Sequence, residues 1–160
     1  MTEAFIKRYG HPDANGDGIL DRQWFLDNIA VFGAPWPMMT SWDPVVRVVR
    51  FQAHKLAGPK IVKALENVAD AVGLDYLISH GFDRWGGCFN FRLIRGGNTL
   101  SNHSWGTAVD FNPHLGRLGS EEDRRTYPRF IVESFRAEGF GWGGDKSWAR
   151  ADAMHFELEA

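Results

Sequence analysis

The chain has 160 residues, a formal net charge of −2 and many aromatic residues, including seven Trp and twelve Phe. This length suffices for one hydrophobic core, so we expect effectively one domain, with residues 1–40 as an N-terminal extension packed on a core of residues 41–160. The charge balance lacks the basic footprint of a nucleic-acid-binding protein, and no apolar run is long enough to cross a bilayer. The single cysteine, Cys88, excludes an intrachain disulfide and a cysteine-based metal cluster.

The N-terminus, from Met1 to Arg8, has no apolar stretch of the kind found in signal peptides. We therefore expect synthesis in the cytoplasm without membrane insertion, so that any action outside the cytoplasm requires release by another factor. Neither a coiled-coil pattern nor a large apolar stripe is present, which favours a monomer.

The sequence pattern of the N-terminal extension predicts two short helices followed by a connector. Residues 2–9 form the first helix, with Thr2 as its N-cap. Residues 23–31 form the second, which ends near Gly33. The Pro-rich segment 34–37 predicts a rigid, extended connector to the core.

A loop rich in Asp, Asn and Gly lies between these two helices. Its residues at positions 1, 3, 5, 6 and 9 of an EF-hand loop are Asp13, Asn15, Asp17, Gly18 and Asp21. Position 12 of an EF-hand requires a bidentate Glu, and here it is Trp24. Two interpretations stay open: a Ca²⁺ site that could control activity, or a surface turn that caps the following helix.

The first half of the core alternates between strand and helix patterns. Residues 45–53 are rich in β-branched residues and predict a strand, although their pattern fits a helix nearly as well. Residues 59–72 predict a helix with one apolar face. Residues 74–79 predict a short apolar strand, and residues 80–97 an irregular segment that carries several arginines.

The second half of the core predicts two strands separated by a helix. Residues 106–112 alternate in polarity, which places Asp110 on the open face of a strand. Residues 128–138 predict a helix, residues 141–144 a turn, and residues 155–158 a last strand. This mixture of elements indicates an α+β fold.

Two short blocks of this core carry groups that could bind a metal. His103 and Asp110 stand seven residues apart, and Asp152 precedes His155 by three. Two imidazoles and one carboxylate, with one position left open, are typical of catalytic zinc. On spacing alone another interpretation stays open, in which Asp110 caps a turn and Asp152 begins the last strand.

The sequence around these blocks resembles the zinc D-alanyl-D-alanine carboxypeptidase family. The resemblance rests on Ser101-x-His103-x-x-Gly106-x-Ala108-x-Asp110, Gly141-Trp142-Gly143-Gly144 and Asp152-x-x-His155-Phe156. It covers roughly residues 45–158, and within the family it is closest in type to phage L-alanoyl-D-glutamate endopeptidases. It implies a small antiparallel sheet that carries a zinc site, with helices on its back, as in hedgehog-like D,D-peptidases.

The resemblance also implies roles for individual residues. The zinc ligands fall on His103, Asp110 and His155, and the catalytic carboxylate falls on Asp152. A cationic group that stabilises the oxyanion is expected upstream of His103. We assign it to Arg92, which completes the family pattern Cys88-x-x-x-Arg92, with Arg84 and Arg95 as rivals.

Further residues are candidates for supporting roles. Ser101 and Asn112 are candidates for orienting the ligands. Trp142 and Trp105 either wall the groove or belong to the core. Glu157 is a candidate for a hydrogen bond to a ligand or to the amine of the substrate.

The expected function is therefore a zinc metallopeptidase that hydrolyses peptidoglycan stem peptides. The lack of an export signal favours a bacteriolytic phage endolysin that cleaves L-alanoyl-D-glutamate and reaches the cell wall after holin-type release. The alternatives are a D,D-carboxypeptidase on the same site and a non-catalytic, zinc- or calcium-dependent module that binds the cell wall.

Overall fold

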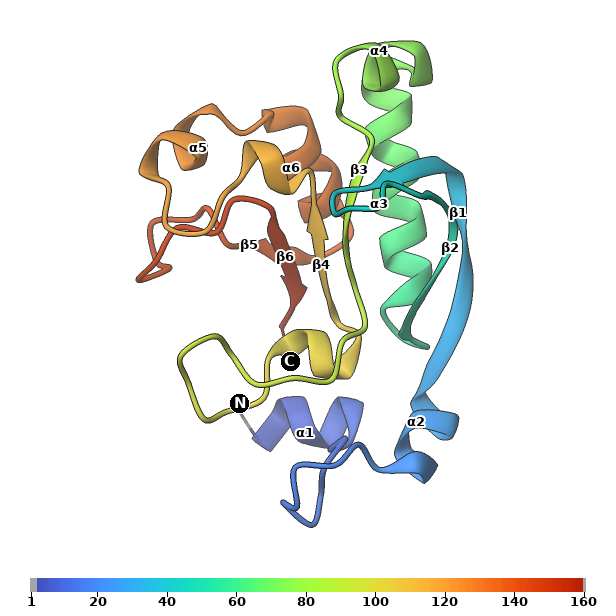
Figure 1. Cartoon of the computed structure of the whole chain (residues 1–160), viewed down its shortest axis with the longest axis vertical. Coiled ribbons are helices and arrows are strands. Elements are labelled where there is room, and N and C mark those ends of the chain that lie inside the picture. Colours follow the sequence, from blue (N-terminus) through green and yellow to red (C-terminus); the bar gives the residue numbers. More distant parts are fainter. Residues whose placement is uncertain (1–2, 160) are drawn as a thin grey trace.

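The computed structural model describes residues 3–159, and Figure 1 shows a single mixed sheet with helices around it. The strands are β1 (Ile29–Thr40), β2 (Arg47–His54), β3 (Arg84–Gly87), β4 (Ala108–Phe111), β5 (Phe140–Trp142) and β6 (His155–Leu158). The α-helices are α1 (Glu3–Tyr9), α2 (Arg22–Asn28), α3 (Gly58–Val72), α4 (Leu74–Ser79), α5 (Glu121–Thr126) and α6 (Arg129–Ala137). Two short 3₁₀ helices, η1 (Asn102–Trp105) and η2 (Pro113–Leu115), flank β4.

The six strands form one sheet in the order β2-β1-β3-β4-β6-β5. Every neighbouring pair is antiparallel except β1 and β3, which run parallel. The α+β class and the largely antiparallel sheet are thus confirmed, and the parallel pair is an addition to the expected pattern. None of the helices in the described range is long and apolar enough to span a membrane.

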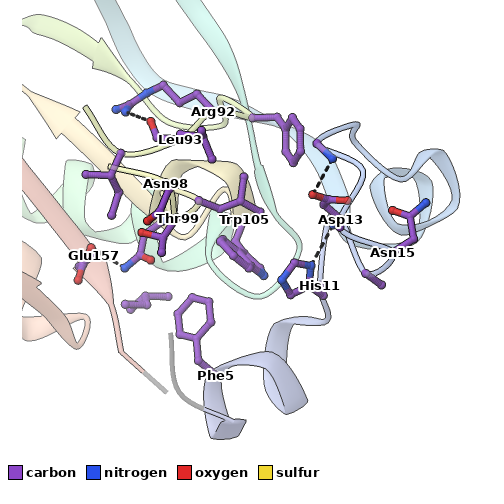
Figure 2. A pocket seen from close by; sticks show the side chains of 18 of the residues that line it. Phe5, His11, Asp13, Asn15, Arg92, Leu93, Asn98, Thr99, Trp105 and Glu157 are labelled. Atoms are coloured by element: carbon purple, nitrogen blue, oxygen red, sulfur yellow. Dashed lines mark hydrogen bonds between the residues drawn. The ribbon is translucent and has the colours of Figure 1, made fainter. Parts of the chain in front are cut away.

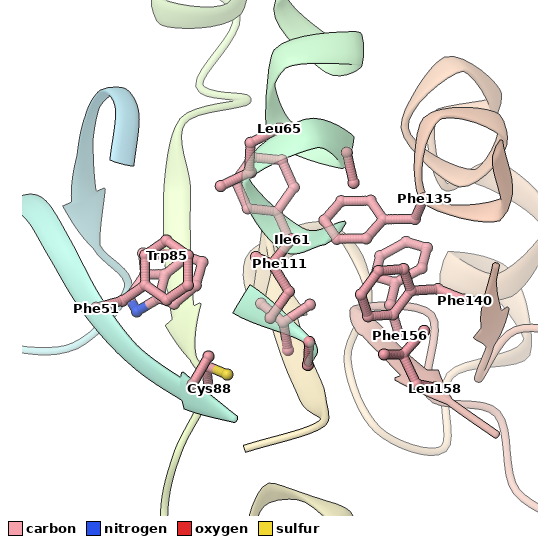
Figure 3. Packing of buried hydrophobic residues seen from close by; sticks show 14 of the residues in the cluster. Phe51, Ile61, Leu65, Trp85, Cys88, Phe111, Phe135, Phe140, Phe156 and Leu158 are labelled. Carbon is pink, nitrogen blue, oxygen red and sulfur yellow. The ribbon is translucent and has the colours of Figure 1, made fainter. Parts of the chain in front are cut away.

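The hydrophobic core lies between the sheet and the helices α3 and α6, which cover one face of the sheet (Figure 3). Ile61 and Leu65 of α3 are fully buried, and Phe135 of α6 stacks on Phe156 of β6 with ring centroids 4.2 Å apart. Side chains alternate along a strand. The inward rings of Phe111 and Phe156 therefore fix the outward direction of their neighbours in β4 and β6.

Residues 74–79 are a helix, α4, and not the predicted strand. Gly73, with a φ of 84°, ends α3 and allows the chain to turn into this second helix. Only Leu77 of α4 is buried, whereas Leu74 and Ile78 are exposed. A short apolar run does not by itself distinguish a strand from a helix, which is why the prediction was wrong.

The predicted connector at residues 34–37 is part of β1. The second helix ends at Asn28, earlier than predicted, and the chain pairs with β2 from Ile29 onward. The register shifts between Gly33 and Met38, across the two prolines. Proline cannot donate a ladder hydrogen bond, so an irregular part of a strand accommodates it.

The segment 80–97, predicted to be irregular, contains the four-residue strand β3, which its glycines concealed. The other predicted elements agree closely with the structure. The strands predicted at 45–53, 106–112 and 155–158 correspond to β2, β4 and β6, and the helices at 59–72 and 128–138 to α3 and α6. The predicted turn at 141–144 begins later than expected, because Gly141 and Trp142 belong to β5. The first helix is α1, and its predicted cap, Thr2, lies outside the described residues.

The Asp-rich loop of the N-terminal region folds as a capped turn. Asp21 is the N-cap of α2, and its carboxylate accepts a hydrogen bond from the Trp24 amide at 2.8 Å. Asp13 accepts from the amides of Asp17 and Gly18. These bonds agree with the surface-turn interpretation, and nothing in the described part of the chain supports a calcium site there.

Candidate metal centre

His103 is placed by the short helix η1 and by the glycine that follows it. Gly106 has a φ of 65°, in the left-handed region that favours glycine. A Cβ atom at this position would lie 2.7 Å from the backbone nitrogen of His54. Any larger residue would therefore push η1, and His103 with it, away from the sheet.

Asp110 and His155 are placed by the pairing of β4 with β6. The antiparallel register sets Asp110 directly opposite His155. Their neighbours Val109 and Phe156 are fully buried on the other face of the sheet. The side chains of the pair therefore project together on the face opposite the core.

These elements bring three potential ligands together. One atom each of His103, Asp110 and His155 lies within 4.8 Å of the other two. The Asp110 Oδ1 atom is 3.3 Å from His103 Nε2 and 2.9 Å from His155 Nδ1. Among the described residues this His–Asp–His group is the cluster that could hold a metal ion.

The second nitrogen of each imidazole has its own hydrogen-bond acceptor. His103 Nδ1 lies 2.7 Å from the Cys88 carbonyl oxygen, and His155 Nε2 lies 2.9 Å from Glu157 Oε2. Histidine ligands commonly donate their other ring N–H to a carbonyl or a carboxylate, which fixes tautomer and orientation. The donor set therefore fits zinc, which His103 Nε2 and His155 Nδ1 would hold together with Asp110.

The hydrogen bonds within the group shift the pKa values of its members. Burial by itself raises the pKa of Asp110, but the hydrogen bonds from His103 and His155 outweigh it and hold the pKa well below its ordinary value. Burial would lower the pKa of His155, whereas its bonds to Asp110 and Glu157 raise it to about 10. Asp110 thus carries a negative charge, around which the two imidazoles are arranged.

Asp152 lies beside this group with an unsatisfied carboxylate. Its Oδ1 atom is buried and has no hydrogen-bond partner in the described part of the chain. Burial raises the pKa of this carboxyl group to about 6. An orphaned, desolvated carboxylate next to potential zinc ligands is suited to accept and return a proton near neutral pH.

A cavity of about 470 Å³ opens onto the His–Asp–His group and Asp152. Three arginines line it: Arg92, Arg95 and Arg150. Arg84, one of the rivals for the oxyanion role, does not line this cavity and instead lies on β3 beside Asp83. Arg92 donates a hydrogen bond from Nη1 to the Leu93 carbonyl oxygen.

The other candidates fall into different surroundings. The Ser101 hydroxyl accepts from the His103 amide at 3.4 Å, so it contacts the backbone that carries this ligand. Asn112 bonds to the backbone of Arg84 and Phe82, away from the imidazoles. Trp142 belongs to the core and not to a groove wall, because it is buried and its Nε1 donates to the Ala153 carbonyl.

Sequence reasoning missed two residues that contribute to the cavity. Asn102 donates to Glu157 Oε2 at 2.6 Å and so holds the carboxylate that contacts His155. Arg150 precedes Asp152 by two residues and adds a third cation to the wall. Its proximity to Asp152 in the sequence was the available signal.

Comparison with known proteins adds one finding. A family model described as D-alanyl-D-alanine carboxypeptidase matches residues 95–158, the segment that contains η1, β4, α5, α6, β5 and β6. Neither the curated proteins nor the solved structures gave a match. The matched segment carries all three potential ligands and Asp152, so the chain is similar to this family at the residues that could form a zinc site, and the His–Asp–His geometry is compatible with a zinc peptidase.

Proposed function

We propose that the protein is a zinc metallopeptidase that hydrolyses the stem peptides of peptidoglycan, with L-alanoyl-D-glutamate as the bond cleaved. The observation that carries this proposal is the half-buried carboxylate of Asp152 beside the His–Asp–His group, with an Oδ1 atom that is buried and unpartnered among the described residues. A site that only binds metal has no need of such a group, whereas a hydrolase needs a base beside its water.

The chain's own residues account for the proton transfers. Zinc held by His103, Asp110 and His155 would supply Lewis acidity that activates water and polarises the scissile carbonyl. Asp152 takes the proton from the attacking water and returns it to the nitrogen of the leaving amine. Its pKa of about 6 suits both directions of transfer near neutral pH.

Arg92 is the proposed partner of the developing oxyanion. It lies on the wall of the same cavity, and a guanidinium aimed at developing charge stabilises a transition state more than a ground state. Arg95 and Arg150 line the same cavity and remain rivals for this role. Arg→Lys variants made singly at the three positions identify the oxyanion partner. Only the substitution of that partner should lower kcat without raising KM.

A D,D-carboxypeptidase is the second candidate, favoured by the description of the matching family model. Both activities use the same residues, so they differ in the product. We propose the phage-endolysin class, with holin-type release, because the motifs around His103, Asp110 and His155 resemble those of phage L-alanoyl-D-glutamate endopeptidases.

Digestion of purified peptidoglycan by zinc-loaded protein, followed by mass spectrometry of the fragments, tests the proposal. A new amino terminus on D-glutamate is the expected result. Free D-alanine as the sole product would transfer the protein to the carboxypeptidase class. Intact stem peptides, with zinc bound, would leave the non-catalytic wall-binding module as the better account.

A further inference from the structure

A second and larger cavity, of about 1130 Å³, lies beside the candidate metal centre. Its walls come from segments far apart in the sequence: the N-terminal helix and loop, the segment between β3 and η1, and the end of β6 (Figure 2). Nothing in the proposed reaction uses this space. It is large enough for a ligand of several rings.

The two cavities adjoin. Arg92, Ile94, Asn102 and Glu157 line both of them. A ligand that extends from the larger cavity to the His–Asp–His group would therefore lie next to the Asn102–Glu157 pair. The larger cavity is accordingly an extension of the same groove.

The charges differ between the two parts of the groove. Arg95 and Arg150 line only the smaller cavity, which contains the metal centre. Among the described residues that line the larger cavity, Arg92 at its boundary is the one Lys or Arg side chain, while Asp13, Glu157 and Glu159 add negative charge. An anionic peptide chain is therefore favoured on the arginine side and disfavoured on the other, where an uncharged group can lie.

The larger cavity also presents hydrogen-bonding groups that are accessible to a ligand. Asn98 and Thr99 are exposed on its wall, and their side chains make no hydrogen bond within the described residues. The side chains of Asn15 and His11 line it as well but already make hydrogen bonds within their loop, and Phe91 adds an aromatic ring. Neutral amides and hydroxyls beside an aromatic side chain suit a sugar, which offers hydroxyl and N-acetyl groups.

We propose that this cavity is a glycan subsite that receives the sugar to which the stem peptide is attached. The inference rests on the proposed endopeptidase function. Attachment of the peptide converts the muramic acid carboxyl group into an amide, so a peptide-bearing glycan is uncharged. In muramyl-L-alanoyl-D-glutamate only one residue separates the sugar from the scissile bond, which matches a sugar cavity adjoining the metal centre.

The test compares two substrates that carry the same stem peptide. One is the disaccharide-peptide released from peptidoglycan by a muramidase, and the other is the free stem peptide with its N-terminus acetylated. We expect a KM at least about tenfold lower for the disaccharide-peptide, because part of the binding free energy comes from the sugar. The double variant Asn98→Ala, Thr99→Val should bring the ratio of the two KM values close to one.

The control is Thr126→Val on α5, which lines neither cavity and should keep the wild-type ratio. Equal KM values for both substrates in the wild-type protein would overturn the glycan subsite while leaving the peptidase intact. If neither substrate is cleaved, the proposed function fails. In that case the disaccharide-peptide is titrated onto the Asp152→Asn protein. The glycan subsite predicts that it binds, and that the added double substitution Asn98→Ala, Thr99→Val weakens this binding.

Discussion

Asp152 is the residue on which the catalytic interpretation depends. It is placed by backbone bonds that do not involve its carboxylate: its amide donates to Gly143, and its carbonyl accepts from the His155 amide. Replacing the carboxylate should therefore preserve the site. We expect Asp152→Asn to lower kcat by about 10²–10⁴ with zinc still bound, because general base catalysis contributes a factor of this order.

The measurement is a single-turnover assay on a stem peptide, combined with the zinc content of each protein. Asp75→Asn, an exposed carboxylate on α4, serves as the matched control and should cleave at the wild-type rate. Cleavage by Asp152→Asn at the control rate would remove Asp152 from the mechanism.

Glu157 is expected to act on zinc through His155. It accepts from His155 Nε2 and is itself held by Asn102. Loss of such a partner typically costs 10- to 100-fold in metal affinity. We expect Glu157→Gln to weaken zinc binding by about this factor in a chelator competition assay, while Glu133→Gln, exposed on α6, leaves it unchanged.

At the scale of residues, the sequence identified the ligands better than their surroundings. Strand alternation placed Asp110 and His155 on an open face of their strands, and His103 was expected from the loop before the first of these strands. All three were identifiable as candidate ligands from their match to the family motifs. Asn102 and Arg150 were not identifiable in this way, since their roles follow from the three-dimensional meeting of η1, β6 and the loop before β6. Trp142 was ambiguous, because an aromatic residue next to glycines fits a groove and a core equally well.

Gly106 couples two elements of the site, η1 and β4. An alanine here would combine a left-handed backbone with a contact of 2.7 Å to the His54 backbone. We expect Gly106→Ala to lower the free energy of unfolding by more than about 1 kcal/mol and to weaken zinc binding. Urea denaturation checks the first effect. Gly97→Ala is the control, since its Cβ would meet Ile94 only at ordinary contact distances.

The start of α5 is tied to the chain before it by the pair of Asp123 and Arg117. Both carboxylate oxygens accept from the guanidinium, and these bonds hold the pKa of Asp123 well below its ordinary value. Because folding lowers this pKa, the pair stabilises the fold above about pH 4, and the contribution is lost as the pH falls further.

Asp123→Asn should therefore reduce stability at neutral pH, and the deficit should shrink in acid. Thermal unfolding across the pH range measures it. Glu66→Gln breaks an exposed pair with Lys63 and should change little. A deficit that stays constant down to strongly acidic pH would contradict the role of the ion pair.

Among the elements, long and strongly periodic segments were predictable and short ones were not. The pattern of α3 and α6 follows from apolar side chains that all meet the sheet. For α4 the pattern was misleading, because most of its apolar side chains remain exposed. β1 was hidden by its two prolines, which the structure tolerates at a register shift that no local pattern reveals.

At the scale of the whole molecule, the potential ligands join distant parts of the chain through η1, β4 and β6. A metal that binds only the folded state stabilises it, by about 2.7 kcal/mol at 100 times its dissociation constant. We expect zinc to raise the melting temperature of the wild-type protein and to leave that of His103→Ala unchanged. An equal rise in both proteins would place the zinc elsewhere.

The central claim is that one zinc ion at His103, Asp110 and His155 makes this chain a peptidase. Titration of metal-stripped protein with zinc tests it most directly, with bound metal and stem-peptide cleavage measured in the same samples. The account predicts that cleavage rises in proportion to bound zinc up to one ion per chain, and that His155→Ala neither retains the ion nor cleaves. Full cleavage by the metal-stripped protein, or no cleavage at one bound zinc per chain, would contradict it.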